Sequence, residues 1–293
     1  MAEKFPPLLL DALRQGSVIP YLGAGLLDAA ENTVRLPATP EALAELLTTK
    51  VSVPHKIRKR LTAAAQYIEN FKHRKTLVNL MNGVFSQHGT PTALHQWLST
   101  WPDLPLLVSA WYDDTMQRAL VGRTGGWGMV QGLSQSEHFG QWIGYYHADG
   151  SSATEAESAD WQTLLYQPWG SASPAGNYLV SDSDYVEVLT EIDIQTPIPE
   201  PVQRLRAGRH FLFLGCRFND QLSRSFARQI MKRSSDQHWA ILPTDMSRNE
   251  QRFLLEQRIT PLHMSLEELI SGSLALLPTA EIATESVIAE SVI

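Results

Sequence analysis

Apolar residues along this chain form two patterns, short continuous runs and runs at helical spacing, and the two alternate. The run at 17–22 predicts a short buried strand, the run at 104–108 is typical of a strand buried on both faces, and the run at 210–215 predicts the strongest strand. From Pro40 to about Phe85 the spacing predicts three helices, and Thr39 is the expected cap of the first. Strands separated by helices need crossover connections. The pattern therefore predicts an α/β protein with a Rossmann-like, doubly wound, mostly parallel sheet and helices on both faces.

Beyond these runs the alternation continues, apart from one segment of different character. Glycines and aromatics dominate residues 121–160, which predicts a small irregular insertion with one strand at 142–147, either a lid or partner surface or a plain surface loop. We expect one domain over residues 1–275, with a helical part at about 40–86, and a disordered tail at 276–293. The other expected strands lie at 177–180 and 238–242, and a last strand and helix lie around 261–270. Further helices are expected to begin near 91, to run from Asp113 or Asp114 to Leu120, to end at 207, and to span 183–192, 220–232 and 247–257.

The charge balance argues against nucleic acid as the main partner. The chain has 24 basic and 31 acidic residues and a net charge of −7, whereas nucleic-acid binding depends on neutralising phosphates. A basic run at 55–60 is the exception; it either touches phosphate or, as is usual for such runs, forms a solvated face. No run reaches the roughly twenty apolar residues of a membrane span, and no secretion signal is present, so we expect a cytoplasmic protein.

A glycine turn, Gly23-Ala24-Gly25, follows the first predicted strand. In a doubly wound sheet, ligands lie beyond the carboxyl ends of the strands, where a glycine turn lets the backbone approach a pyrophosphate. Two nearby glycines after a strand are also common in tight bends that bind nothing. The turn alone leaves both interpretations open.

Six segments of the chain, taken together, resemble the bacterial sirtuin-like family and follow its order, over about residues 16–273. The resemblance implies NAD or an ADP-ribose-like nucleotide as ligand in a Rossmann-type fold. Many members hydrolyse NAD to nicotinamide and ADP-ribose, often in antiviral defence. It assigns Gly23, Ala24 and Gly25 to the pyrophosphate, Asp113 to the nicotinamide amide or its replacement, and Gly215, Asn219 and Asp220 to the adenine-side ribose; helix capping is the alternative role for the last two. The segments are 18–25, 64–68, 92–98, 107–120, 178–185 and 213–220.

Two family motifs carry tryptophan where the working residue is expected. The family's T-T-N-Y-D reads Ser-Ala-Trp-Tyr-Asp at 109–113, and its K-L-H-G-S reads Gln-Pro-Trp-Gly-Ser at 167–171. Trp111 thus replaces the asparagine that fixes the ribose, and Trp169 replaces the histidine base. An indole offers one N–H donor and no base, so residue 169 cannot act as a general base. The two indoles either stack on a ligand ring or fill the nicotinamide pocket and close it.

These substitutions lead to three hypotheses. The first is a catalytically degenerate domain that binds NAD, ADP-ribose or a related nucleotide as a sensor or regulatory subunit. The second is an NAD hydrolase in which Asp113, Asp114 or His147 takes over; His95, the other histidine considered, lies on an apolar helical face and is expected in the core. The third is an interaction scaffold with a plugged pocket.

Metal and partner expectations follow from the same residues. A single cysteine, Cys216, excludes an intramolecular disulfide and the Cys₄ zinc site of protein-deacetylating sirtuins, so any activity is expected to be NAD glycohydrolysis without zinc. Carboxylates and histidines do not cluster at metal-ligand spacing. Homo-oligomerisation or a protein partner is expected to involve the helices between Pro40 and Phe85.

Overall fold

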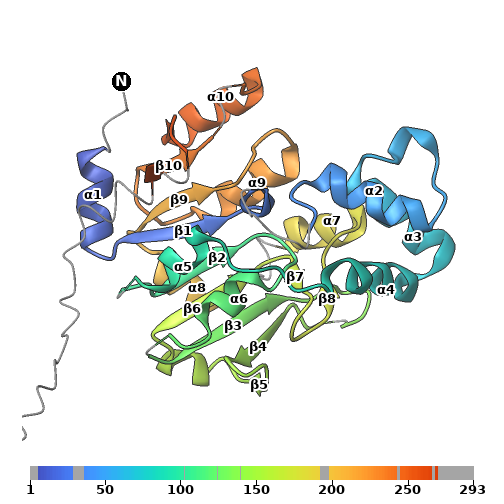
Figure 1. Cartoon of the computed structure of the whole chain (residues 1–293), viewed down its shortest axis with the longest axis horizontal. Helices are drawn as coiled ribbons and strands as arrows, with labels where there is room; N and C mark the ends of the chain where they lie inside the picture. The colour runs from blue at the N-terminus through green and yellow to red at the C-terminus, as the bar shows by residue number, and fades with distance from the viewer. Residues whose placement is uncertain are drawn as a thin grey trace, which may run out of the picture.

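One large sheet runs through the molecule (Figure 1). The computed structural model describes residues 6–28, 36–101, 103–123, 125–138, 140–191, 198–242, 245–265 and 268–269, and within them this sheet has nine strands. A separate two-stranded sheet pairs β7 (Gly170–Ser171) with β8 (Asn177–Tyr178). From edge to edge, the large sheet consists of β11 (Ile259–Leu262), β10 (His238–Ile241), β9 (His210–Leu214), β1 (Val18–Leu22), β2 (Leu106–Ser109), β6 (Thr163–Gln167), β3 (Trp127–Gly132), β4 (Ile143–His147) and β5 (Ser152–Ala153).

All strands from β11 to β3 run parallel to their neighbours, and only β4 and β5 are antiparallel. In β1 every residue is buried, as the continuous apolar run predicts. Alternate side chains of this strand lie in two different core clusters: Ile19 and Tyr21 in one, Val18 and Leu22 in the other. Both faces of the sheet are therefore covered, and the predicted α/β, Rossmann-like fold is confirmed.

The helices divide between the two core clusters. The cluster that contains Val18 and Leu22 packs against α1 (Pro7–Arg14), α5 (Ala93–Ser99) and α6 (Thr115–Leu120). The cluster that contains Ile19 and Tyr21 packs against a different set, which includes the helices that precede and follow the last strands. Its members are α7 (Asp182–Glu191), α8 (Glu200–Arg206), α9 (Gln221–Ile230) and α10 (Arg248–Glu256), together with α2 (Pro40–Lys50), α3 (Leu61–Lys72) and α4 (Arg74–Phe85).

Helices α2, α3 and α4 form a lobe beside the sheet, on the right in Figure 1. The three helices predicted between Pro40 and Phe85 are confirmed. Thr39 caps the first as expected, because its side chain accepts a hydrogen bond from the amide of Ala42 and Pro40 takes the first helical position. Arg74 fastens the lobe to the rest of the protein through an ion pair of 2.9 Å with Asp184 of α7.

The segment 121–160 is more regular than the sequence suggests. The strand expected at 142–147 is confirmed as β4, but the segment also supplies β3 and β5 and so extends the main sheet. Its glycines permit close packing within a strand: a Cβ on Gly128 would lie 2.3 Å from the Trp161 ring, and one on Gly132 would lie 2.1 Å from the Pro168 carbonyl oxygen. Tight contact explains glycine at these two positions. The expectation of an irregular insertion is wrong for the residues of β3, β4 and β5.

Two further expectations about strands need correction. Strand β6 lies between β2 and β3 and is absent from the predicted elements, because its five residues run directly into Pro168 and the aromatic motif. The strand expected at 177–180 forms only over 177–178 and pairs with β7 outside the main sheet. The tail at 276–293 and most of the last expected helix lie outside the described residues. Within the described ranges, no helix is long and apolar enough to cross a membrane.

Candidate functional site

Four parallel strands end at one edge of the large sheet, and the candidate residues follow these ends. Gly23 follows β1, Trp111 lies two residues beyond β2, Trp169 two residues beyond β6, and Gly215 directly after β9. In the sheet these strands are neighbours in the order β9, β1, β2, β6. The structure therefore brings the sequence-predicted segments together at the edge where ligands bind in doubly wound folds.

The glycines after β1 and β9 interlock two loops. Gly215 has φ of +64°, and a Cβ there would lie 2.5 Å from the amide nitrogen of Leu26. A Cβ on Gly23 would lie 2.5 Å from the carbonyl oxygen of Gly215, and one on Gly25 would lie 2.9 Å from the same oxygen. Close approach of backbone to backbone is thus sufficient to explain glycine at all three positions.

Hydrogen bonds use two of the amides that were expected to face a pyrophosphate. The amide of Gly23 donates to the Leu214 carbonyl at 2.8 Å, and that of Gly25 donates to the Gly215 carbonyl at 2.9 Å. These two amides are engaged within the protein. The third residue of the turn, the half-buried Ala24, begins a short 3₁₀ helix at 24–27, and its contact with a phosphate stays a prediction.

Trp111 is buried and its one donor is occupied. Its side chain lies in the core cluster of Ile19 and Tyr21, and the residue is 6% exposed. The indole N–H donates to the carbonyl oxygen of Pro37 at 2.9 Å, and the ring packs edge-on against Phe85 of α4 at 6.4 Å between centroids. Trp111 therefore joins the segment after the glycine turn to the helical lobe.

Trp169 is enclosed by aromatic rings from the other side of the site. The centroid of its indole lies 4.7 Å from that of Tyr185 on α7 and 4.4 Å from that of Phe226 on α9. The residue is 7% exposed and belongs to the same core cluster as Trp111. Both substituted positions are packed into the protein, which is the arrangement expected if the indoles close the pocket.

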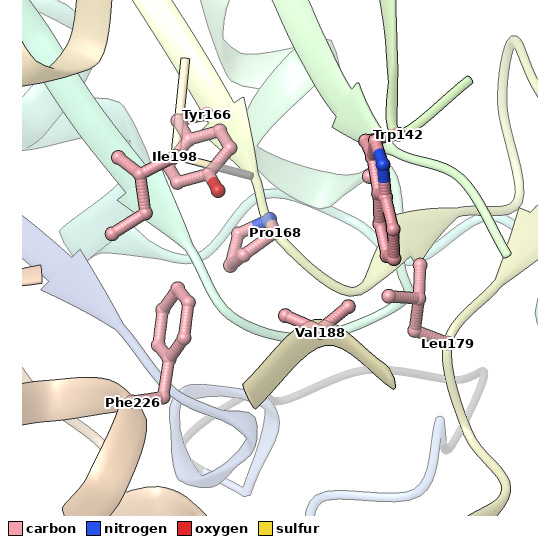
Figure 2. A pocket seen from close by; sticks show the side chains of 8 residues that line it. Trp142, Tyr166, Pro168, Leu179, Val188, Ile198 and Phe226 are labelled. Carbon is pink, nitrogen blue, oxygen red and sulfur yellow. The ribbon is translucent and has the colours of Figure 1, made fainter. Parts of the chain in front are cut away.

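A small hollow lies next to Trp169 (Figure 2). Its cavity volume is about 10 Å³, which is roughly enough for one water molecule. The side chains of Tyr166, Trp142 and Phe226 point toward it from β6, the start of β4 and α9. Such a hollow has no room for a dinucleotide without movement of these side chains.

Asp113 and Asp114 are both buried, and the structure gives them different roles. Asp113 Oδ1 accepts a hydrogen bond of 2.9 Å from the amide of Thr115 and so orders the start of α6. Asp114 Oδ2 lies 2.6 Å from Nδ1 of His88, whose side chain is 54% exposed. Within the described residues Asp114 Oδ1 is buried without a hydrogen-bond partner.

The His88–Asp114 pair is a functional candidate that the sequence did not indicate. His88 lies 26 positions before Asp114, in the loop after α4, and no motif marks it. A carboxylate that accepts the Nδ1 hydrogen leaves Nε2 as a hydrogen-bond acceptor and potential base. The loop is close to the site, because a Cβ on the adjacent Gly89 would lie 3.0 Å from both Leu36 and Thr115.

The other two histidines considered from the sequence lie elsewhere. His95 is buried, and its Nδ1 accepts from the Thr92 backbone at 3.3 Å and lies 2.7 Å from the Thr92 hydroxyl, as expected of a satisfied core residue. Burial lowers the His95 pKa, which a nearby Asp113 partly offsets. His147 lies on β4, near the far edge of the sheet, with Nε2 3.7 Å from Glu157. The structure does not bring His147 to the strand ends at β1 and β2.

Beyond β9, the polar pair Asn219 and Asp220 is exposed. Asp220 caps α9, because its carboxylate accepts from the Ser223 amide at 2.8 Å, so the capping role expected as an alternative is present. Next to this pair, Arg217 binds the buried Glu250 of α10 with N–O distances of 3.0 and 3.1 Å. Burial raises the pKa of Glu250, but hydrogen bonds from Arg217 and Ser247 outweigh this effect and lower it to about 2.

A buried network of side-chain amides lies next to the two tryptophan motifs. Nε2 of Gln117 donates to Gln167 Oε1 at 2.9 Å and to the Ser173 carbonyl at 2.7 Å, while Gln131 donates to the same two acceptors at 2.8 and 2.7 Å. Ser171 joins this network by accepting from Gln117 at 3.3 Å. Satisfied buried networks of this kind specify one arrangement of the chain, and here they hold the loops after β2 and β6 together.

Metal-binding chemistry finds no support in the described residues. No group of three or more His, Cys, Asp or Glu side chains is placed to hold a metal ion there. Cys216 is buried, and burial raises the pKa of its thiol, so it is an unreactive core residue.

Comparison with known proteins adds one positive finding. A family model described as SIR2-like domain matches residues 105–262. This range begins just before β2 and ends with β11, so it contains both tryptophan motifs as well as Gly215, Asn219 and Asp220. No curated protein matches the chain.

Proposed function

The chain belongs to the SIR2-like domain family, a family with NAD-related ligands, and on this basis we propose that it binds NAD, ADP-ribose or a related nucleotide without cleaving it efficiently. The observation that carries the absence of efficient cleavage is the burial of Trp111 and Trp169, each in contact with rings from neighbouring helices. The protein acts as a sensor or regulatory subunit. Its signal is the binding of the nucleotide at the site, rather than turnover of the nucleotide.

The proposed loss of cleavage has a chemical reason. Breaking the nicotinamide–ribose bond creates positive charge on the ribose, which an enzyme stabilises with a fixed amide and completes with a base. The Trp111 N–H already donates to Pro37, and Trp169 has no base to offer. A positioned general base contributes roughly 10²–10⁴-fold to such reactions, so its loss reduces turnover by about that factor.

The proposed ligand pose follows from which residues stay accessible. Asn219 and Asp220 are exposed beyond β9, and Ala24 is half-buried at the end of β1. These residues fit the adenosine and phosphate part of the ligand. The nicotinamide end fits poorly, because the neighbouring hollow is small and lined by apolar side chains. ADP-ribose, which lacks nicotinamide, is therefore the preferred form.

A thermal-shift panel with NAD, ADP-ribose and nicotinamide tests the binding. We expect ADP-ribose to raise the melting temperature in a saturable way, and nicotinamide to leave it unchanged, since a ligand stabilises only the state that it binds. Asn219→Ala should reduce the ADP-ribose response, whereas Asn79→Ala, an exposed asparagine on α4, should not. If none of the nucleotides changes the melting temperature, the scaffold hypothesis replaces this one.

The His88–Asp114 pair favours a second candidate, an NAD hydrolase with a relocated base. In this version Nε2 of His88 takes a proton from water, the water oxygen bonds to the ribose C1′ carbon, and the electron pair of the broken bond leaves on nicotinamide. The pair would need to act on water at the strand ends, and its 2.6 Å contact and half-exposed imidazole suit that role.

Nicotinamide release separates the two candidates. The second predicts measurable release that His88→Gln and Asp114→Asn abolish, with His138→Gln, a change at an exposed histidine, as the matched control. The first predicts release at about one-hundredth or less of that of an active family member, and no further change in the His88 variant.

A further inference from the structure

Five of the 24 basic residues of this acidic protein lie within eleven positions that contain no acidic residue. Between Glu45 and Glu69 the chain has no acidic residue, and within this stretch five lysines and arginines lie between positions 50 and 60. We call these five residues the basic tip; they are Lys50, Lys56, Arg58, Lys59 and Arg60. Because the basic tip contributes +5 to a net charge of −7, the remainder of the chain carries −12.

The basic tip lies at the outer end of the helical lobe (Figure 1). It comprises the end of α2, a 3₁₀ turn at His55–Ile57 and the residues before α3. All five basic side chains are exposed. Lys59 pairs with Glu45 at 2.9 Å, and within the described residues no ion pair engages the other four.

The backbone under the basic tip is well ordered. Val53 is 5% exposed and anchors the loop in the core, and the amide of Arg60 donates to the Ile57 carbonyl at 2.8 Å. The backbone that carries these charges is thus anchored to the lobe. Neighbouring like charges repel one another and destabilise the folded state, so the stability of this protein alone gives no reason for the cluster.

We infer that the basic tip is a docking surface for an acidic segment of another protein. A partner that brings carboxylates relieves the repulsion among the tip residues and gains charge-assisted hydrogen bonds to lysine and arginine. A nucleic acid fits less well, because a phosphate chain that extends past this small surface meets a protein that carries −12. The inference is independent of nucleotide binding at the strand ends.

Binding of a fluorescent ten-residue glutamate peptide, followed by anisotropy at low salt, tests the inference. The wild-type protein should bind, and the variant Lys56→Gln/Arg58→Gln/Arg60→Gln should bind at least about tenfold more weakly. The control Lys72→Gln/Lys75→Gln/Arg248→Gln removes the same charge from other exposed positions and should stay within about twofold of wild type. Added salt should weaken wild-type binding through screening.

Three results would overturn the inference. These are no binding by wild type, an equal loss in the control variant, and tighter binding of a ten-nucleotide single-stranded DNA than of the peptide. The melting temperature shows whether the tip variant is folded. This variant should melt at or above the wild-type temperature, because the substitutions remove repulsion among the basic side chains. If it melts lower, Lys56→Glu alone must still weaken peptide binding, and failure of that single variant also rejects the inference.

Discussion

The two halves of the sheet edge at which the parallel strands end are built differently. Beyond β9 the surface is polar and open, with Asn219 and Asp220 exposed. Beyond β2 and β6 it is aromatic and closed, with Trp111 and Trp169 in the core. Both halves lie on one sheet edge, but β2 and β9 lead into helices α6 and α9 whereas β6 leads into the β7–β8 pair, so the path of the chain as well as the side chains differs between them. Within one family framework, the residues that follow β2 and β6 are thus packed into the interior, whereas those that follow β9 stay exposed.

The largest effect is expected from opening the closed half. Trp169→Ala removes an indole that contacts Tyr185 and Phe226, and we expect a loss of about 4 kcal/mol of unfolding free energy from lost contacts and cavity formation. Denaturant unfolding measures it. Trp142→Ala, a half-buried tryptophan at the same hollow, should cost only about 1–2 kcal/mol. Equal costs would mean that Trp169 is not a core residue.

Arg74→Ala tests the polar support of the same half. The guanidinium donates to Asp184 and to the Tyr178 carbonyl, and removing it leaves a buried carboxylate without its cation. We expect a loss of about 3 kcal/mol in unfolding free energy. Arg217→Ala, at the open half, also removes the cation from a buried carboxylate, but it should cost less, about 1–2 kcal/mol, because the Arg217 side chain is 40% exposed and Glu250 keeps hydrogen bonds from the Phe218 and Ser247 amides. A reversed order would contradict the contrast between the halves.

Gly215→Ala probes the loop interlock of the open half. The alanine Cβ would meet the Leu26 nitrogen at 2.5 Å in a residue with φ of +64°, so we expect a cost of about 2–3 kcal/mol. Gly208→Ala is a close control, since Gly208 has φ of +70° but nothing within 4 Å of its added Cβ. Its cost should be about 1 kcal/mol, from backbone strain alone. Similar melting temperatures for the two variants would show that close approach is unimportant.

The smallest effect concerns acid stability. Because the pKa of Glu250 falls from an ordinary 4.5 to about 2 on folding, its stabilisation is complete above pH 4.5 and is lost as the pH falls toward 2. Glu250→Gln should therefore flatten the pH dependence of unfolding free energy in this range by about 1–2 kcal/mol. Glu256→Gln, at an exposed pair with Arg252, should leave the curve unchanged. An unaltered slope in the Glu250 variant would contradict the assignment.

Strand and helix order is largely readable from the sequence, because apolar periodicity reflects local burial. The exceptions share a cause. Strand β6 is short and ends at Pro168, and β3 contains Gly128 and Gly132, whose small size matters only against Trp161 and the Pro168 carbonyl. Both strands are defined by neighbours far along the chain. The spacing of apolar residues along the sequence carries no information about such contacts.

Residue identity alone decides one functional question. An indole has no base, so the amino-acid sequence by itself determines that residues 111 and 169 cannot act as general bases, and it also carries the resemblance to the family around them. The direction of the indoles is decided by the tertiary structure, because it depends on Pro37, Phe85, Tyr185 and Phe226, which lie on other elements. The same holds for His88, which meets Asp114 only after α4 and β2 pack. The identity of a residue fixes its chemical groups, whereas its burial and its hydrogen-bond partners depend on long-range contacts that only the folded chain forms.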